Sequence, residues 1–182
     1  MEELVKEISI NSDLDKNNHF VIDQFIATDV ADALSLAIRN HHRAQPMPSD
    51  GQVIGSPAFS ELDFLKEAHR SILQKTEQYV GAALVPTYVY GRIYQHGAVL
   101  APHRDRDACE VSITLNLSSD CDWGIWFEKQ AGEQREVILR PGSAAIYLGC
   151  DTLHWRDAFE GTECIQVFFH FVLKGGERDR PE

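Results

Sequence analysis

Ala101-Pro102-His103-Arg104-Asp105 is the stretch on which the fold and the chemistry of this chain both depend. Side chains alternate between the two faces of an extended strand, so His103 and Asp105 point to the same side. A later segment, Leu153-His154-Trp155-Arg156, brings a second histidine. Two imidazoles and one carboxylate on one face of a metal leave open positions and suit non-haem Fe(II) that binds O2 and a co-substrate. The sequence therefore predicts an iron site formed by His103, Asp105 and His154.

A His-x-Asp sequence is short and also occurs by chance, so other origins have to be considered. His-Arg-Asp opens the catalytic loop of protein kinases, in which an Asn follows five residues after the Asp. Here that position is Glu110, no Gly-rich loop precedes the motif, and 182 residues are too few for a kinase domain. The kinase interpretation is therefore excluded.

The composition is that of a globular protein with an acidic surface. Hydrophobic residues make up 43% and charged residues 25% of the 182 residues, which allows one domain, residues 1–182, with a substantial core. The formal net charge of −11 and the pI of about 5.1 argue against a non-specific nucleic-acid binder, which needs a basic face. No apolar run approaches the roughly 20 residues of a membrane span.

The cysteines and the N-terminus indicate a reducing compartment. The four cysteines have no CxxC spacing and are expected to be reduced, partly buried apolar residues. Met1-Glu2-Glu3 is acidic and lacks a signal-peptide pattern. We expect a cytoplasmic protein that does not contact membranes.

The N-terminal part, residues 1–85, is expected to support the rest of the domain. Apolar residues recur there at helical spacing, and the loop between the two helices contains three prolines and two glycines. Long loops of this kind often act as lids or binding loops. The predicted elements are a polar lead-in (1–18), a strand (19–26), a helix from an N-cap at Thr28 to about His41, a loop (44–58) and a helix that begins at Phe59 or Ser60.

From Pro86 to about Leu173 the hydrophobic period changes to two, which is typical of strands. The strands predicted from this pattern are Tyr88–Tyr94, Val99–Asp105, Cys109–Leu117, Trp123–Glu128, Arg135–Leu139, Ser143–Leu148, a short one at Leu153-His154, and Cys164–Leu173. We expect a mostly β fold, a two-sheet roll or barrel (residues 86–173) with the N-terminal helices packed outside it. Residues 174–182 are expected to be a charged, frayed tail.

Two segments resemble the Fe(II)/2-oxoglutarate-dependent dioxygenases, notably their prolyl-hydroxylase-like branch. The segment from Tyr94 through Gly97 to Pro102-His103-Arg104-Asp105 is similar to the family's Tyr…Gly…Pro-His-x-Asp stretch. The segment from Pro141-Gly142 through Tyr147 and Gly149 to His154 is similar to its run of a turn, a strand and the distal histidine. Strand Ile165–Phe171 resembles the family's last barrel strand.

The resemblance implies a double-stranded β-helix, the jelly-roll barrel also found in cupins. It implies Fe(II) bound by His103, Asp105 and His154, with 2-oxoglutarate as co-substrate, O2 as oxidant and ascorbate as a supporting reductant. It further implies hydroxylation of a substrate with release of succinate and CO2. The substrate is a peptide or protein side chain or a small molecule, and neither its identity nor the oligomeric state can be read from the sequence.

The resemblance fails at the residue that should bind the distal carboxylate of 2-oxoglutarate. In the family, an Arg or Lys lies about ten residues after the distal histidine, and this chain has Cys164 there. A buried carboxylate needs a cation. Arg156 shares the metal-facing side of its strand with His154 and is our first candidate, and Arg92, two residues before Tyr94, is the second. Each could instead form a structural ion pair.

Other polar residues are candidates for the lining of the same site. Tyr94 resembles the family's phenol donor to the co-substrate, although a half-buried strand tyrosine would look the same. Asn116 shares one strand face with Ser112 and Thr114, which is either the barrel interior or the solvated outside. Gln166 and His170 share a face of the last strand. Arg104 and Trp155, with His170, are candidates for substrate or outer contacts.

Two other functions remain open at the level of sequence. A cupin-like binding or sensing domain without turnover would explain the missing basic residue at Cys164. A nucleic-acid demethylase also carries His-Arg-Asp after a tyrosine-bearing strand, but the acidic pI disfavours nucleic acid as a partner.

Overall fold

The structure is a computed structural model that describes residues 9–129 and 132–180 of the chain. Its α-helices are α1 (Ser12–Asn17), α2 (Thr28–Ala44) and α3 (Asp63–Val80), and η1 (Asp107–Cys109) is a short 3-10 helix. The larger sheet contains, in spatial order, β1 (His19–Ile22), β8 (Ala144–Leu148), β5 (Val111–Ser119), β10 (Glu163–Leu173), β3 (Leu84–Gln95) and β2 (Ala58–Ser60). The smaller sheet contains β4 (Leu100–His103), β9 (His154–Arg156), β6 (Gly124–Glu128) and β7 (Gln134–Ile138).

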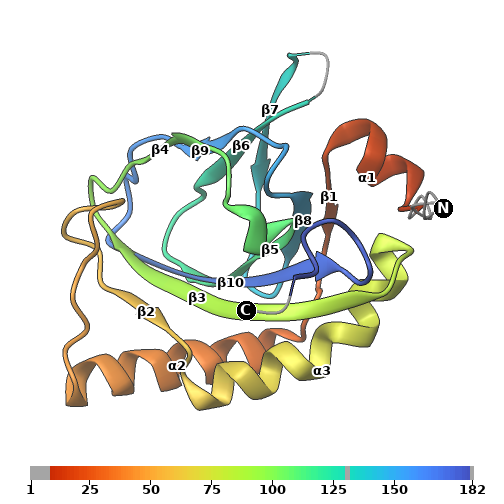
Figure 1. Cartoon of the computed structure of the whole chain (residues 1–182). Coiled ribbons are helices and arrows are strands. Elements are labelled where there is room, and N and C mark those ends of the chain that lie inside the picture. The colour runs from red at the N-terminus through yellow and green to blue at the C-terminus, as the bar shows by residue number, and fades with distance from the viewer. Residues whose placement is uncertain (1–8, 130–131, 181–182) are drawn as a thin grey trace, which may run out of the picture.

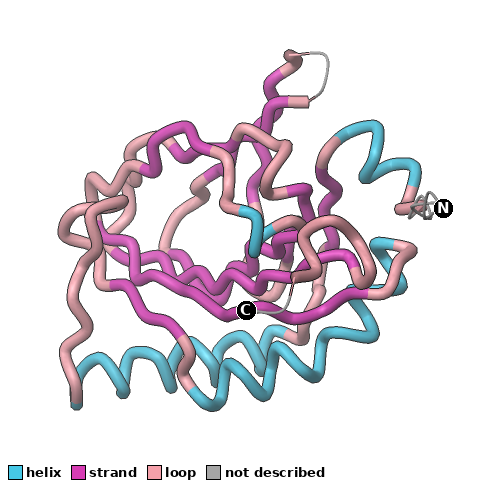
Figure 2. The backbone as a smooth tube through the Cα atoms, in the orientation of Figure 1, coloured by secondary structure: helices cyan, strands magenta, loops and turns pink. Residues whose placement is uncertain are grey.

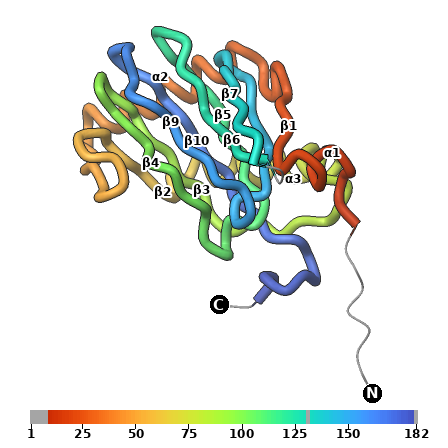
Figure 3. Tube along the Cα trace, turned by 90° about the horizontal axis from the view of Figure 1, so that it is seen from above, coloured from red at the N-terminus to blue at the C-terminus, as the bar shows by residue number. Residues whose placement is uncertain are grey.

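The two sheets face each other, and the long helices cover only one of them. Figure 1 shows α2 and α3 side by side beneath the larger sheet, with β4, β9 and β6 on the opposite side of the molecule. Figure 2 shows the same three layers of helix, sheet and sheet by colour. Seen from above, β4 and β9 lie over β3 and β10, and β6 and β7 lie over β5 (Figure 3). All strand pairs in the described part of the chain are antiparallel, and the two sheets do not close into a continuous barrel. The prediction of a mostly β fold with helices outside is confirmed.

The alternation of β10 separates an apolar layer from a polar one. Its odd-numbered residues from Ile165 to Phe171 belong to the main hydrophobic cluster, which also contains Ile38 of α2 and Leu65 of α3. Each fully buried side chain of this size stabilises the fold by about 1.5–3 kcal/mol. The even-numbered residues, from Cys164 to His170, point to the space between the sheets. The helices therefore hold the larger sheet from outside and leave its inner face free for polar groups.

The structure corrects several predicted boundaries in the N-terminal part. Residues 12–17, expected to be a loose lead-in, form α1, whose N-cap Asn11 accepts a hydrogen bond from the backbone of Asp13. Thr28 is not the N-cap of α2; Ala27 occupies that position without a side-chain cap, and Thr28 is the first helical residue. The lead-in before residue 9 lies outside the described residues.

The second long helix begins later than predicted because a short strand precedes it. Phe59 and Ser60, expected to start the helix, belong to β2, which pairs with β3. The Phe59 ring lies against Gly91 of β3, where any Cβ would overlap it. Glu61 has a positive φ of 58°, a conformation that interrupts a regular helix or strand, and α3 starts only after this turn.

The C-terminal segment is held to the domain as far as Arg178. Arg178 pairs with Glu110 at 3.0 Å and with Asp107 at 3.5 Å, so the prediction of a frayed tail is wrong for residues 174–178, and residues 181–182 lie outside the described residues. Among the helices that the structure describes, none is both long enough and apolar enough to cross a membrane.

Candidate metal centre

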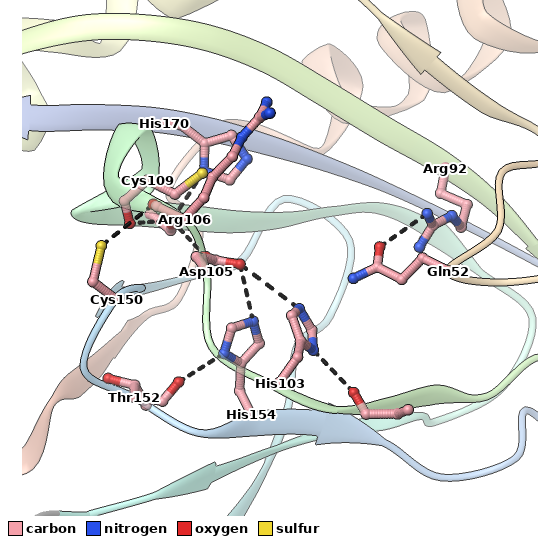
Figure 4. Close-up of polar contacts among 12 residues, drawn as sticks. Gln52, Arg92, His103, Asp105, Arg106, Cys109, Cys150, Thr152, His154 and His170 are labelled. Carbon is pink, nitrogen blue, oxygen red and sulfur yellow. Dashed lines mark hydrogen bonds and ion pairs between the residues drawn. The ribbon is translucent and has the colours of Figure 1, made fainter.

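The three residues predicted to bind iron come together between the ends of two short strands. β4 ends at His103 and β9 begins at His154, and these two residues are register partners. Asp105 follows β4 and is fixed by its backbone N–H, which donates to the Gly149 carbonyl at 2.9 Å. Figure 4 shows both imidazoles pointing at the Asp105 carboxylate, with each Nε2 atom 3.7 Å from Oδ1. The donor atoms of the three side chains lie within 4.8 Å of one another, a spacing that one metal ion can bridge.

Backbone carbonyls set the orientation of both imidazoles. His103 Nδ1 lies 2.9 Å from the Ala101 carbonyl, and His154 Nδ1 lies 2.9 Å from the Thr152 carbonyl. A carbonyl can only accept, so each Nδ1 carries the proton and each Nε2 offers its lone pair. Burial lowers the pKa of His154 to about 4, against the opposing effect of Asp105. The neutral imidazole is the form that binds a metal.

The second oxygen of Asp105 is held from the opposite side. Ser112 Oγ donates to Asp105 Oδ2 at 3.0 Å and also lies 2.9 Å from His170 Nδ1. Gly149 lies directly beneath, where a Cβ would be 2.5 Å from Oδ2 and 2.8 Å from the Ser112 hydroxyl. One carboxylate oxygen is therefore used by the protein, and the other faces the two histidines.

A second set of possible donors shares Asp105 but suits a metal less well. Asp105, Cys109 and His170 also have donor atoms within 4.8 Å of one another. However, His170 Nδ1 already contacts Ser112, and the Cys109 thiol contacts the Tyr88 hydroxyl at 2.9 Å. Burial raises the pKa of Cys109 to about 11, and because this thiol and His170 Nδ1 already have partners, the set offers fewer free donor atoms than His103, Asp105 and His154 do.

The metal site opens into a cavity of about 380 Å³ between the two sheets. This volume is within the range of small-molecule sites. Of the residues singled out from the sequence, those that line the cavity are His103, Asp105, His154, Tyr94, Arg92, Arg104 and His170.

Arg156 is a fully buried cation without a carboxylate partner in the described part of the chain. Nη1 donates to the Trp123 carbonyl at 3.0 Å, and the guanidinium lies over the Trp123 ring at 4.7 Å. Its Nε and Nη2 atoms have no hydrogen-bond partner, and neither has the buried Tyr94 hydroxyl. Burial lowers the pKa of Arg156, because desolvation penalises the charged form. A charge left in this state is costly unless an anion binds it.

The Arg156 guanidinium also lies close to the position where the expected basic residue is missing. Cys164 is the register partner of Tyr94, and burial raises the pKa of the Cys164 thiol while the Arg156 charge opposes this. Tyr94, Arg156 and Cys164 thus share one end of the space between the sheets. Tyr94 lines the cavity, whereas Arg156 and Cys164 lie buried behind its wall, and a cation and a phenol without partners are the donors that a buried carboxylate needs.

Arg92, the second candidate, already has an anionic partner. Asp50, from the loop before β2, lies 2.5 Å from Arg92 Nη2, and the Tyr90 hydroxyl donates to the same carboxylate. Gln52 accepts a further bond from Arg92 at 3.1 Å. Burial opposes the charge of Arg92, but Tyr94, Tyr90 and Asp50 together raise its pKa. Its charge is neutralised within the protein.

The polar face of β5 is the inside of the fold, which settles an alternative that the sequence left open. Ser112, Thr114 and Asn116 are all buried. Thr114 donates to Gln166 Oε1 at 3.3 Å, and Asn116 Nδ2 donates to the Leu139 carbonyl at 2.5 Å, while Asn116 Oδ1 has no partner. These side chains and Gln166 are not part of the cavity wall, and they form a polar layer behind it.

Trp155 points away from the metal. It alternates with His154 and Arg156 on β9, and its ring stacks on Trp126 at 5.9 Å with an interplanar angle of 5°. The half-buried pair covers the far side of the smaller sheet and is not part of the cavity wall.

Several cavity residues were not predicted from the sequence, among them Asp50, Tyr88 and Tyr147. Asp50 lies in an irregular loop, where no sequence pattern shows its direction. Tyr88 and Tyr147 both lie on predicted strands. Tyr88 is an even number of residues from Tyr94, so the two share one face of β3. The period of two could have identified Tyr88, whereas Asp50 required the path of the loop.

Comparisons with known proteins show a likeness in structure but not in sequence. No family model matches the sequence, and no curated protein matches it either. A prolyl-4-hydroxylase from Pseudomonas putida is similar in structure, with a TM-score of 0.73 and 18% identity over 87% of this chain and 94% of that one. HygX from Streptomyces hygroscopicus, solved with nickel and 2-oxoglutarate, has a TM-score of 0.68 and 14% identity over 87% of this chain and 84% of that one.

A third protein of similar structure is an epimerase and not a hydroxylase. The non-haem α-ketoglutarate-dependent epimerase SnoN from nogalamycin biosynthesis has a TM-score of 0.73 and 12% identity over 87% of this chain and 77% of that one. At these identities the comparisons show that the chain has the fold of such oxygenases. They confirm at the level of the fold the resemblance inferred from the two sequence segments.

Proposed function

We propose that this protein is an Fe(II)- and 2-oxoglutarate-dependent oxygenase that hydroxylates a substrate bound in the cavity. The observation that carries the proposal is the convergence of His103, Asp105 and His154 at the wall of a cavity. Three ligands on one side of a metal leave positions for a co-substrate and O2. Bound Fe(II), 2-oxoglutarate and O2 supply an oxidative decarboxylation, which yields succinate and CO2, and the oxygen atom transferred to the substrate.

The protein itself holds and orients the reacting groups. The carbonyls of Ala101 and Thr152 keep both Nε2 atoms directed at the metal position. The hydrogen bond from Ser112 occupies Oδ2 of Asp105, which leaves Oδ1 to bind the metal. The cavity wall includes Leu100, Ile125 and Phe168, which limit the access of water. In this way the chain fixes the ligand geometry before any substrate binds.

We assign the distal carboxylate of 2-oxoglutarate to Arg156 rather than Arg92. Arg156 is buried and has two N–H groups without partners, beside the equally unpartnered Tyr94 hydroxyl. Arg92 is neutralised by Asp50. A guanidinium delivered from β9 would thus replace the basic side chain that related enzymes carry at the position of Cys164.

The proposal extends to the fold type, the domain, the cell compartment and the substrate class. The two facing sheets would be the halves of a double-stranded β-helix, and residues 1–182 a single domain. The four cysteines are free thiols, which suits a reducing compartment such as the cytoplasm. The substrate is a peptide side chain or a small molecule.

The proposal is tested by succinate production. Purified protein is incubated with Fe(II), 2-oxoglutarate, ascorbate and air, with and without candidate substrates, and succinate is quantified. We expect succinate from the wild-type protein, stimulated by the correct substrate, and none above background from Asp105→Ala. Binding of metal and 2-oxoglutarate without succinate under any substrate would instead favour a cupin-like binding or sensing domain.

A further inference from the structure

The mouth of the cavity carries two cations on either side of the Asp105 ligand. Arg104 and Arg106 both line the cavity, and both are exposed to solvent. In the part of the chain that the structure describes, neither guanidinium forms an ion pair with a carboxylate. What sets these two arginines apart is their place at the cavity, since they line it together with the Asp105 ligand.

Each guanidinium is oriented by a hydrogen bond that its Nε atom donates. Arg104 Nε donates to the Asp151 carbonyl at 3.3 Å, and Arg106 Nε donates to the Tyr88 hydroxyl at 3.3 Å. The Arg106 guanidinium also lies over the Tyr88 ring at 4.6 Å, and that ring packs on His170 at 4.6 Å. Each arginine is thereby oriented while its two terminal NH2 groups remain available, which is the fork that binds carboxylate or phosphate oxygens.

The other charges of the cavity already have partners. Its acidic residues are Asp50, which is bound by Arg92, and Asp105, which faces the two imidazoles. The remaining charges of the wall are the two arginines at the mouth. They form a local basic site on a protein whose overall charge repels anions, and such a site attracts and selects an anionic ligand.

We propose that Arg104 and Arg106 form the substrate-recognition site of the cavity, and that the substrate carries an oxyanion group, a carboxylate or a phosphate, which they bind. The inference rests on the proposed function because it names the substrate class of that same site. The rest of the substrate would extend past Tyr88 and Phe168 toward the metal.

The test uses three probes that share a phenyl ring: benzoate, phenyl phosphate and neutral benzamide. Their affinities are measured calorimetrically on the full chain saturated with Mn(II) and 2-oxoglutarate, without O2. We expect the wild-type protein to bind one of the two anions at least roughly tenfold more tightly than benzamide, since hydrogen bonds to a charged acceptor are the strong ones. Whether benzoate or phenyl phosphate binds more tightly distinguishes a carboxylate from a phosphate substrate.

The variants Arg104→Gln, Arg106→Gln and their combination should lose this discrimination, with the double variant binding all three probes alike. Arg70→Gln, which removes the same charge from an exposed position on α3 outside the cavity, should behave as wild type. A wild-type protein that binds neither anion more tightly than benzamide, or a double variant that keeps the preference, overturns the inference. Succinate formation without substrate reports on the proposed function separately, so the two can fail independently.

Discussion

At the scale of single residues, the proposed role of Arg156 would account for Cys164 at the position where a basic residue was expected. The guanidinium is buried, contacts the Trp123 carbonyl, and keeps two N–H groups without partners. Sequence alone ranked Arg156 above Arg92 because it shares a strand face with His154, and the Asp50 partner of Arg92 supports that order. The sequence could not show Asp50, because no periodicity governs the direction of a side chain in an irregular loop.

Arg156→Ala should raise the 2-oxoglutarate concentration for half-maximal succinate formation by roughly 30-fold or more, because removing one partner of a buried charge pair costs about 2–5 kcal/mol. Metal affinity, measured with Mn(II) in the absence of 2-oxoglutarate, should stay close to wild type. Arg156→Lys, which keeps the charge, should recover part of the loss, and Arg70→Ala serves as the control. An unchanged 2-oxoglutarate requirement would move the carboxylate site away from Arg156.

At the scale of elements, the loop before β2 is fastened to the larger sheet by one carboxylate. Asp50 Oδ1 accepts from the backbone N–H groups of Gln52 and Val53 at 3.0 and 3.1 Å, and Oδ2 accepts from Arg92 and Tyr90. The Asp50 carboxylate both folds the loop and places it at the cavity. The sequence predicted a long loop there. It did not predict β2, which begins at the end of this loop, because a strand of three residues is too short to show a period.

Asp50→Asn should loosen this loop and destabilise the fold by about 1–2 kcal/mol, because a buried guanidinium loses its charged acceptor while part of the site stays hydrated. Urea unfolding gives the stability, and amide hydrogen exchange should quicken in residues 49–57. Asp63→Asn is the matched control, since its carboxylate is exposed and, in the described part of the chain, forms an ion pair with Lys66 alone. Equal behaviour of the two variants would show that Asp50 does not fasten the loop.

At the scale of the whole molecule, the fold holds several neutral histidines in its interior. Burial lowers the pKa of His69, His154 and His170 to about 4. His69 packs between Phe169 and Phe171, on the helix side of β10.

The strand order could be predicted only as a class, a two-sheet roll, because the pairing of β10 with both β3 and β5 depends on contacts far apart in the sequence.

The metal-free protein should lose stability as the pH falls from about 6.5 to about 4. Over this window the unfolded chain binds protons that the folded chain does not, so the free energy of unfolding decreases by up to about 1.4 kcal/mol per pH unit for each of these histidines. Urea unfolding at a series of pH values measures the slope. His69→Gln should reduce the slope by up to the contribution of one proton, about 1.4 kcal/mol per pH unit. A slope equal to that of wild type would show that His69 is not held neutral.

The proposed activity depends on one metal being held by His103 at the end of β4, by Asp105 just after it and by His154 at the start of β9. The most direct measurement is an anaerobic titration of the protein with Fe(II) in the presence of 2-oxoglutarate, followed by the visible charge-transfer absorption of the chelated iron. We predict saturation at one Fe(II) per chain, with the absorption lost in His103→Ala, Asp105→Ala and His154→Ala and retained in Arg70→Ala. Iron binding and absorption that persist unchanged in all three ligand variants would contradict the account.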